Sequence, residues 1–360
     1  MASILTEALC VDVNLADNRL FFKRLLERTN MTKTAHTILV VGGAGYIGSH
    51  MVKALLAEGY RVVTLDNLST GYRDAVVGGE FILGDMNDRA LLRAVFMDHA
   101  ISAVMHFASY IQVGESVTAP SKYYENNVTN TLALLDAMME KNIRRFIFSS
   151  SAAVYGNPIR VPIDEDHPKA PINPYGRSKW MVEQILSDYE TAYGLKSISL
   201  RYFNAAGADP GGQLGERHEP ETHLIPLILQ AASGRRPSIS IFGNDYDTPD
   251  GTCIRDYVHV ADLCQAHGLA LQRLLQDGAS GVFNLGNGNG FSVMEVIRAA
   301  REVTGKDIPL EIKSRREGDP PRLVADSTRA IQELAWRPRF ASLSAIIADA
   351  WAWERRLQSH

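Results

Sequence analysis

The sequence predicts an α/β fold: a doubly wound parallel sheet, followed by a smaller, mixed α/β domain at the C-terminal end. Three observations carry this prediction. An apolar strand, a glycine-rich turn, a helix and a second strand follow one another in residues 37–67. Strand-like and helical stretches then alternate as far as Asn204, after which the pattern loosens into a loop rich in glycine and proline. Strands that alternate with helices are typical of a parallel sheet with helices on both faces.

The individual elements follow from local patterns. The apolar run from Ile38 to Val41 suits a strand that is buried on both faces. Helical stretches such as 128–142 and 178–193 separate the later strand-like runs, which are "EFILGD", "AVMHFA", "RRFIFSSS" and "SISLRYFN". Residues 1–36 differ in pattern from the rest of the chain, and we expect them to be a loosely ordered leader without a part in the chemistry.

Composition narrows the class of protein. The 360 residues are 46% hydrophobic and 22% charged, with a net charge of −4, which is an ordinary profile for a soluble protein. Because neither sign of charge dominates, we expect no nucleic-acid or membrane partner, and no apolar run reaches the roughly 18 residues of a membrane span. Cys10, Cys253 and Cys264 fit neither a disulfide framework nor a paired zinc motif. We therefore predict a cytoplasmic protein without a metal site.

The glycine-rich turn indicates a dinucleotide site. Gly42, Gly45 and Gly48 form G-x-x-G-x-x-G between a strand and a helix, where backbone N–H groups at the helix N-terminus can approach a pyrophosphate. Asp66 ends the second strand, and a carboxylate there accepts hydrogen bonds from ribose hydroxyls and repels a 2′-phosphate. The predicted cofactor is NAD rather than NADP. The alternative is a glycine-rich turn that binds no ligand.

The segment "NPYGRSKWMVEQIL" places a phenol and an ammonium on one face of a helix. Tyr175 and Lys179 are one turn apart, a spacing that is also common for surface pairs without a function. Beside a nicotinamide cofactor, the ammonium would favour the phenolate and make Tyr175 a base near neutral pH. Ser151, at the end of a strand, could hydrogen-bond the substrate oxygen from which Tyr175 takes a proton. The alternative is that Ser151 only caps the end of the strand. The three residues are the predicted catalytic group.

The chain resembles the extended short-chain dehydrogenase/reductase family and, within it, the UDP-glucose (UDP-galactose) 4-epimerases. The resemblance covers about residues 37–356. It rests on "VVGGAGYIGSH", "LDNLSTG", "MHFASYIQVGES", "YYENNV", "FIFSSSAAVYG", "PYGRSKWMVEQIL", "LRYFNAAGADP", "IFGNDYDTPDGTCIRDYVHVADL", "FNLGNG" and "RREGDPP". It implies an NAD-binding Rossmann domain over 37–204, with a returning segment near 252–268, and a UDP-sugar-binding domain over 205–356.

The resemblance also implies which residues bind each ligand. Those expected around NAD are Gly42, Gly45, Tyr46, Ile47, Gly48, Asp66, Asn67, Asp85, Met86, Phe107, Ala108, Asn126, Tyr175, Lys179 and Phe203. Those expected around the UDP-sugar are Ser151, Tyr175, Asn204, His223, Leu224, Phe242, Arg255, Tyr257, Arg316, Asp319 and Leu323. The two arginines would clamp the diphosphate, because a planar guanidinium pairs well with phosphate oxygens. Leu323 would lie beside the C2 substituent of the sugar.

Two positions depart from the family pattern. Many members carry a lysine after "HFA", where this chain has Ile111 and Gln112, so a charge contact to the cofactor is missing. His223 stands where many members have an asparagine, and it would either serve near the diphosphate or be a structural histidine.

The implied reaction is inversion at C4 of a UDP-hexose through a 4-keto sugar, on UDP-glucose and UDP-galactose and also on the N-acetylated pair. A UDP-pentose 4-epimerase is one alternative. A nucleotide-sugar dehydratase is another, but it needs an acid/base pair where this chain has Ala152 and Ala153. A non-catalytic NAD-binding regulator is the third. The family resemblance also implies a homodimer formed through helices within 115–142 and 176–193.

Overall fold

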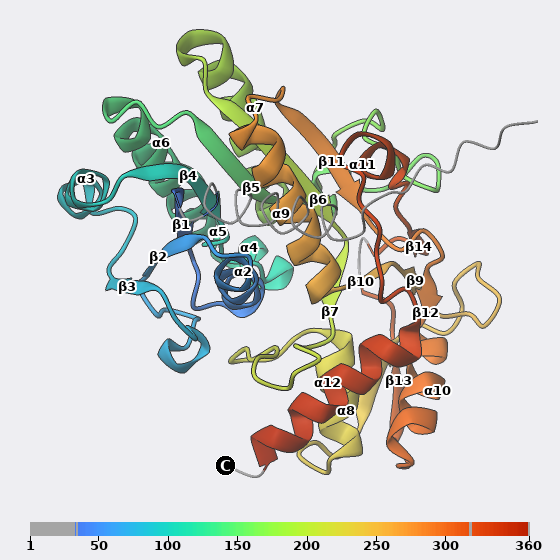
Figure 1. The fold of residues 1–360 in the computed structure, drawn as a ribbon. Helices are drawn as coiled ribbons and strands as arrows, with labels where there is room; N and C mark the ends of the chain where they lie inside the picture. The colour runs from blue at the N-terminus through green and yellow to red at the C-terminus, as the bar shows by residue number, and fades with distance from the viewer. Residues whose placement is uncertain (1–32, 34, 317–318, 359–360) are drawn as a thin grey trace, which may run out of the picture.

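A seven-stranded parallel sheet forms the centre of the molecule and confirms the predicted fold class (Figure 1). The computed structural model describes residues 33, 35–316 and 319–358, so most of the expected leader lies outside the described residues. The strand order is β11-β6-β5-β4-β1-β2-β3, and every neighbouring pair is parallel. The strands are β1 (Thr37–Val41), β2 (Arg61–Asp66), β3 (Glu80–Leu83), β4 (Ile101–His106), β5 (Arg145–Ser151), β6 (Lys196–Tyr202) and β11 (Gly281–Leu285).

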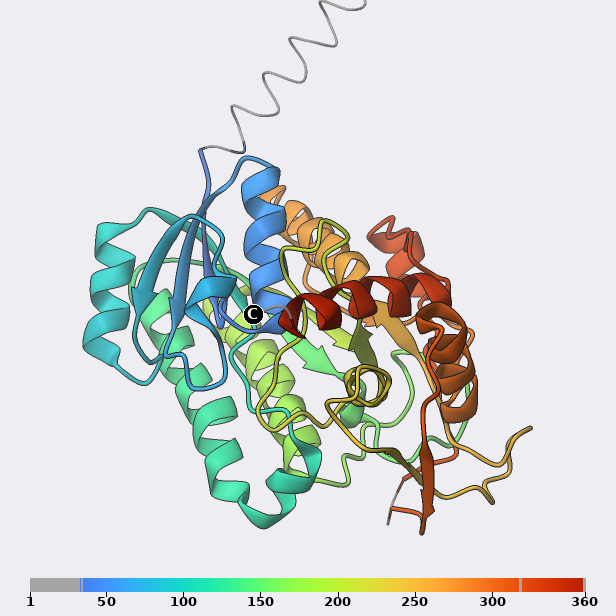
Figure 2. The same ribbon diagram turned by 90° about the horizontal axis from the view of Figure 1, so that it is seen from below.

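Helices cover both faces of this sheet, and β1 shows why its sequence is apolar throughout. Ile38 and Val40 point into one core, whereas Leu39 and Val41 point into the other. Successive side chains of a strand alternate between faces, so a central strand between two helical layers needs apolar residues at every position. The helices of the first layer are α2 (Tyr46–Ala57) and α9 (Val260–Leu275), which lie side by side in Figure 2. Those of the second are α3 (Arg89–Asp98), α6 (Asn130–Glu140) and α7 (Pro174–Tyr193).

The chain returns to the central sheet further along than the sequence analysis expects. The expected return near 252–268 contains the start of α9, but β11 also pairs in parallel with β6, from Gly281 to Leu285. The run "FNLGNG", assigned to the substrate-binding part, therefore begins inside the central sheet. A single short strand gives no sequence signal for its partner, because pairing between distant segments is set by tertiary packing.

A third core lies under the C-terminal helices α8 (Leu224–Ala232), α10 (Val293–Thr304) and α12 (Leu343–Gln358). Small sheets join this part to the end of the large one. Their strands are β7 (Asn204–Ala206) with β10 (Tyr257–His259), β8 (Ile239–Phe242) with β13 (Leu310–Lys313), and β9 (Ile254–Arg255) between β12 (Phe291–Ser292) and β14 (Arg322–Leu323). The remaining short elements are η1 (Arg73–Ala75), α4 (Val113–Thr118), α5 (Pro120–Tyr124), the π-helical turn η2 (Glu125–Thr129), η3 (Ala152–Val154) and α11 (Thr328–Glu333).

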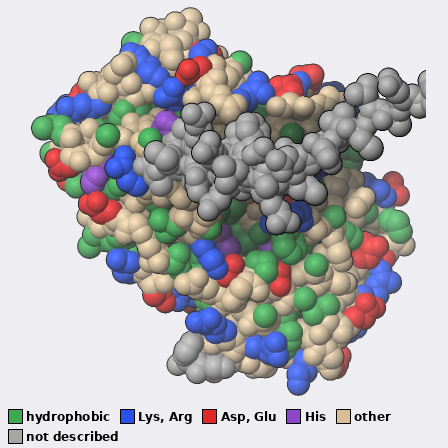
Figure 3. All heavy atoms as spheres, in the orientation of Figure 1, with side chains coloured by type: hydrophobic (Ala, Val, Ile, Leu, Met, Phe, Trp, Pro, Cys, Tyr) green, Lys and Arg blue, Asp and Glu red, His purple; other side chains and the backbone are tan. Residues whose placement is uncertain are grey.

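Positive and negative side chains are interspersed on the face shown in Figure 3. Across the described part of the chain, every helix is too short or too polar to cross a membrane.

Candidate active site

The glycine turn after β1 has the close packing that a dinucleotide site needs. A Cβ on Gly42, whose φ is +82°, would lie 2.5 Å from the backbone nitrogen of Ala108, and one on Gly48 would collide with the carbonyl of Gly42. A Cβ on Gly45 would meet only the Gly42 oxygen, at 3.4 Å. Gly45 is also the N-cap of α2, and no side chain caps the N–H groups there. Free N–H groups at a helix N-terminus suit a pyrophosphate, so this turn fits NAD.

Asp66 joins the second strand to the glycine turn. Its carboxylate accepts hydrogen bonds from the N–H of Ala44 at 2.9 Å and of Leu68 at 2.8 Å. Burial raises the pKa of Asp66, and these two hydrogen bonds oppose that rise. The amide of Asn67 donates to Asp85 at 2.6 Å, and Met86 is buried in the second core. The residues expected at the adenosine end of NAD thus lie together at the ends of β2 and β3.

The start of α7 holds Tyr175 against the end of β5. The side chain of Asn173 caps the helix by accepting from the N–H of Gly176 at 2.8 Å, and Pro174 occupies the first turn. A Cβ on Gly176 would collide with the carbonyl of Ala153, so only glycine permits this close approach. Tyr175 and Ser151 are both buried, and the Ser151 side chain lowers the pKa of the phenol against the effect of burial. Two residues 24 positions apart in the sequence therefore face one site.

Lys179 is buried one turn further along α7. Its Nζ donates to the Oγ of Ser109 at 2.7 Å and to the carbonyl of Ser149 at 2.8 Å, and it lies 5.9 Å from the centre of the Tyr175 ring. Burial lowers the pKa of Lys179 to about 7, against the opposing effect of Glu183. Neither serine partner is expected from the sequence. The available signal in the sequence was a small polar residue shortly after β4 and a run of small polar residues at the end of β5.

The structure corrects one expectation about Tyr175. From the sequence, Lys179 is expected to lower the pKa of the phenol, but burial raises the pKa of Tyr175 and only the Ser151 side chain opposes this. The physical reason is that the same burial disfavours both charged forms, the phenolate and the ammonium. The protein groups alone therefore keep Tyr175 a neutral phenol at neutral pH.

Other residues expected near NAD lie directly after β4, in η2 and at the start of α2. The backbone of Ala108 packs on Gly42, and the Phe107 ring contacts the ring of His267, with centroids 4.9 Å apart. The amide of Asn126 donates to Asn127 at 2.9 Å. The Tyr46 hydroxyl donates to the carbonyl of Gly207 at 2.7 Å, while Ile47 packs beside the first core.

Asn127 is a positioning residue that the sequence analysis passed over in favour of its neighbour. Its amide donates to Ser178 and to the carbonyl of Tyr110, both at 3.1 Å, and its oxygen accepts from the N–H of Tyr110 at 3.0 Å. These bonds tie α7 to the segment after β4. In the sequence, "ENNV" gave no means to tell which asparagine faces inward.

The residues expected around the uridine diphosphate gather on β9, β14 and the loop between β13 and β14. Arg255 donates to the carboxylate of Asp319, and in the sheet it lies opposite Leu323. The guanidinium of Arg316 lies over the Phe242 ring, 4.0 Å from its centre. Segments far apart in the sequence thus bring two arginines and one aromatic ring to one place.

A small apolar cluster joins this end to Ser151. Ala152, Val154, Tyr155 and Ile163 form it, and Trp180, Phe203 and Leu323 pack against it. Asn204, next to Phe203, donates to the carbonyl of Asp256 at 2.8 Å. Tyr257, opposite Asn204 in the β7–β10 pair, is buried in the third core. Phe203 and Leu323 therefore share one wall with the residue that follows Ser151.

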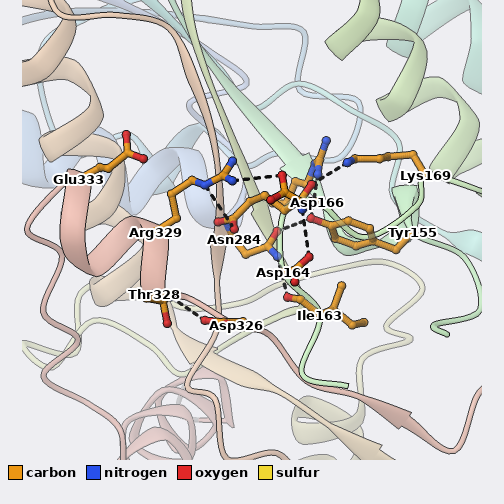
Figure 4. A network of polar contacts seen from close by, with 12 residues as sticks. Tyr155, Ile163, Asp164, Asp166, Lys169, Asn284, Asp326, Thr328, Arg329 and Glu333 are labelled. Carbon is orange, nitrogen blue, oxygen red and sulfur yellow. Dashed lines mark hydrogen bonds and ion pairs between the residues drawn. The ribbon is translucent and has the colours of Figure 1, made fainter. Parts of the chain in front are cut away.

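A polar network around Asn284 includes Tyr155 and Ile163 of this cluster (Figure 4). The Tyr155 hydroxyl donates to the side-chain oxygen of Asn284 at 2.7 Å, and the Asn284 amide donates to the carbonyl of Ile163 at 2.8 Å. Ile163 in turn donates through its N–H to the carbonyl of Val324 at 2.8 Å. The network fixes β14, and with it Leu323, relative to the end of β5.

His223 begins α8 as its N-cap residue, with Leu224 as the first residue of the helix. Its Nδ1 lies 2.9 Å from oxygens of both Glu216 and Glu221. Burial alone would lower the pKa of His223, but the two carboxylates outweigh burial and raise it to about 10. This position is compatible with both expected roles of His223, a contact near the diphosphate and a structural histidine, because carboxylates hold its ring at the start of a helix.

The profile of the NAD dependent epimerase/dehydratase family matches residues 38–286. The chain belongs to this family. The family match spans the glycine turn, Ser151, Tyr175 and Lys179.

Named relatives cover nearly the whole chain. The UDP-glucose 4-epimerase of Halalkalibacterium halodurans is 52% identical over 318 residues, which are 88% of this chain and 95% of that protein. The crystal structure of UDP-glucose 4-epimerase from Brucella ovis in complex with NAD is 49% identical, with a TM-score of 0.86 over 88% of this chain and 97% of that one. The UDP-Glc/GlcNAc 4-epimerase of Campylobacter jejuni is 43% identical, with a TM-score of 0.78 over 89% and 99% of the two chains.

Proposed function

We propose that this protein is a UDP-glucose 4-epimerase, which interconverts UDP-glucose and UDP-galactose through a 4-keto sugar. The observation that carries the proposal is the joint placement of Ser151, Tyr175 and Lys179 beside a glycine turn that fits NAD. The relative from Halalkalibacterium halodurans that is 52% identical supports the choice of reaction.

When bound, NAD⁺ supplies a reversible acceptor for the hydride on C4 of the sugar, and its positive nicotinamide favours the phenolate of Tyr175. The glycine turn and Asp66 would hold its pyrophosphate and adenosine ribose. Tyr175 takes the proton of the 4-hydroxyl and later returns it to the keto oxygen. Ser151 faces Tyr175 and can hydrogen-bond the same sugar oxygen. Lys179 keeps α7 fixed to the ends of the strands through Ser109 and Ser149.

Epimerisation requires UDP to be held firmly and the sugar to turn. Arg255, Arg316 and Phe242 offer two guanidiniums and a ring for the nucleotide, whereas the wall beside Ser151 consists of apolar residues. An apolar wall places few hydrogen bonds on a hexose, so it would permit the keto sugar to present either face.

Two rival activities are less well supported. A 4,6-dehydratase needs an acid/base pair next to the serine, and Ala152 and Ala153 can supply neither proton donor nor acceptor from their side chains. A non-catalytic NAD-binding regulator would not require Ser151, Tyr175 and Lys179 to converge.

A UDP-pentose 4-epimerase is a third alternative. It would use the same anchors, and comparison of substrates separates it from the proposed activity.

The test is incubation of the purified protein with UDP-galactose, UDP-N-acetylgalactosamine and UDP-xylose, followed by chromatographic separation of the products. We expect UDP-glucose from UDP-galactose at the highest rate. A 4-keto-6-deoxy product, or conversion of the pentose alone, would contradict the proposal.

We also propose a cytoplasmic homodimer formed through the surface of α4 and α7. Val113 and Val117 on α4 and Met181 on α7 are apolar and exposed, and α4 and α7 are in contact. Sedimentation should give twice the chain mass, and Val117→Glu should shift the protein toward the monomer. A monomeric wild type would contradict this assignment.

A further inference from the structure

We infer that Glu216, His218, Glu221 and His223 form a structural zinc site. All four lie in the segment "ERHEPETH" before α8, spaced E-x-H-x-x-E-x-H. Each offers one ligand atom, and the four atoms lie within 4.8 Å of one another. This departs from the sequence-based expectation of no metal, which considered only cysteine pairs.

The distances fit a tetrahedral ion. Nδ1 of His218 lies 3.2 Å from Oε1 of Glu216 and 3.5 Å from Oε2 of Glu221, and Nδ1 of His223 lies 2.9 Å from Oε1 of each carboxylate. Zinc takes histidine nitrogen and carboxylate oxygen at about 2.1 Å, which places tetrahedral ligands about 3.4 Å apart. The four ligand atoms lie within 4.8 Å of one another, so a pair at that limit must close by at most about 1.4 Å, which requires rotation of the side chains.

Hydrogen bonding alone leaves this cluster incompletely satisfied. Nδ1 of His218 is buried and makes no hydrogen bond, although it faces both carboxylates. Nδ1 of His223 can carry one proton but meets two carboxylate oxygens at the same distance. A metal ion between the four side chains uses every one of these atoms. Two neutral imidazoles and two carboxylates also balance the charge of a divalent cation.

Donor chemistry selects the metal and its role. Nitrogen and oxygen ligands in a tetrahedron suit Zn²⁺, whereas Mg²⁺ and Ca²⁺ prefer six or more oxygens. Four protein ligands leave no open position, which is typical of structural rather than catalytic zinc.

The position of the cluster indicates what the ion would fix. His223 is the N-cap of α8, and the His218 ring lies edge-on to Tyr46, with centroids 6.4 Å apart. The carbonyl of Glu216 accepts from the indole N–H of Trp353 on α12 at 3.1 Å. The segment therefore contacts the dinucleotide helix α2, the C-terminal helix α12 and the start of α8. Zinc would hold this junction between the two parts of the molecule.

The test is metal analysis of untagged protein purified without chelators. Mass spectrometry of the metals should find close to one zinc ion per chain. Cobalt added to the stripped protein should give the strong visible absorption of a tetrahedral site. Neither readout depends on epimerase activity. Failure of the zinc proposal can therefore be distinguished from failure of the proposed function.

Variants assign the ligands. Because changes in groups that merely support a ligand already weaken metal affinity by about 10- to 100-fold, His218→Ala and Glu216→Gln should each weaken zinc binding by at least about 100-fold. The matched control is His99→Ala, because His99 faces the carboxylate of Glu80 at 3.5 Å outside the cluster. It should bind zinc like the wild type. Wild-type protein that contains no zinc, and that fails to bind zinc against a competing dye, overturns the proposal even if a variant does not fold. Another metal at full occupancy overturns the choice of zinc.

Discussion

We propose that Leu323 limits the size of the sugar that fits, and its replacement by tyrosine gives the sharpest test of the proposed substrate pocket. Leu323 lies opposite Arg255 in the β9–β14 pair and, like Phe203, packs against the apolar cluster that includes Ala152. A tyrosine there would add a ring and a hydroxyl to the wall next to Ser151. On this proposal, a leucine would leave room for an acetamido group at C2 that the larger side chain would fill.

The expected magnitude follows from the number of misfitting groups. One misfitting group in a pocket is worth about 1–3 kcal/mol, which is about 10- to 200-fold in kcat/KM. Leu323→Tyr should therefore raise the preference for UDP-galactose over UDP-N-acetylgalactosamine by a factor in this range. The assay compares kcat/KM for the two sugars under identical conditions, with NAD content and the unfolding midpoint measured on the same samples.

Leu323→Met is the matched control, because a side chain of similar volume is tolerated in a packed wall. It should leave the preference between the two sugars close to that of the wild type. The reasoning is refuted if wild-type protein shows no turnover of the N-acetylated sugars, or if the tyrosine variant slows both pairs equally.

Three further predictions concern the catalytic group and the cofactor. Tyr175→Phe should keep its fold and its NAD but lose nearly all turnover. Tyr189→Phe removes another phenol of α7, one that donates to Asp136 on α6, and should remain active; similar rates for both variants would exclude Tyr175 as the base. Burial lowers the pKa of Lys179 from 10.5 to about 7. Between these two pH values the unfolded chain binds more protons than the folded chain. The free energy of unfolding therefore rises with pH, by up to about 1.4 kcal/mol per pH unit. Urea unfolding of Lys179→Met should lack this rise, and parallel pH profiles for the two proteins would contradict the burial argument. Asp66 predicts that the cofactor released on denaturation is NAD; enzymatic assay of the supernatant would contradict this if it found NADP.

The local sequence pattern was sufficient to predict those elements of the structure that depend on neighbouring residues. The unbroken apolar run of β1, the glycine spacing after it and the Asn-Pro start of α7 each reflect a backbone or burial requirement that the sequence states directly. The order and type of the main elements, the NAD-type turn and the pairing of Tyr175 with Lys179 on one helical face could be predicted for this reason. The substrate residues came from family resemblance, since isolated arginines and aspartates carry no local signal.

Tertiary structure decided what depends on segments that are distant in sequence. The return of β11 to the central sheet, the hydrogen bonds from Lys179 to Ser109 and Ser149, and the raised pKa of Tyr175 all arise from burial and pairing across the fold. The Glu216–His223 cluster lies within one short segment, yet whether its four side chains converge depends on how α2, α8 and α12 constrain the loop. Sequence spacing fixes which groups are available, whereas packing fixes their distances and their charge states.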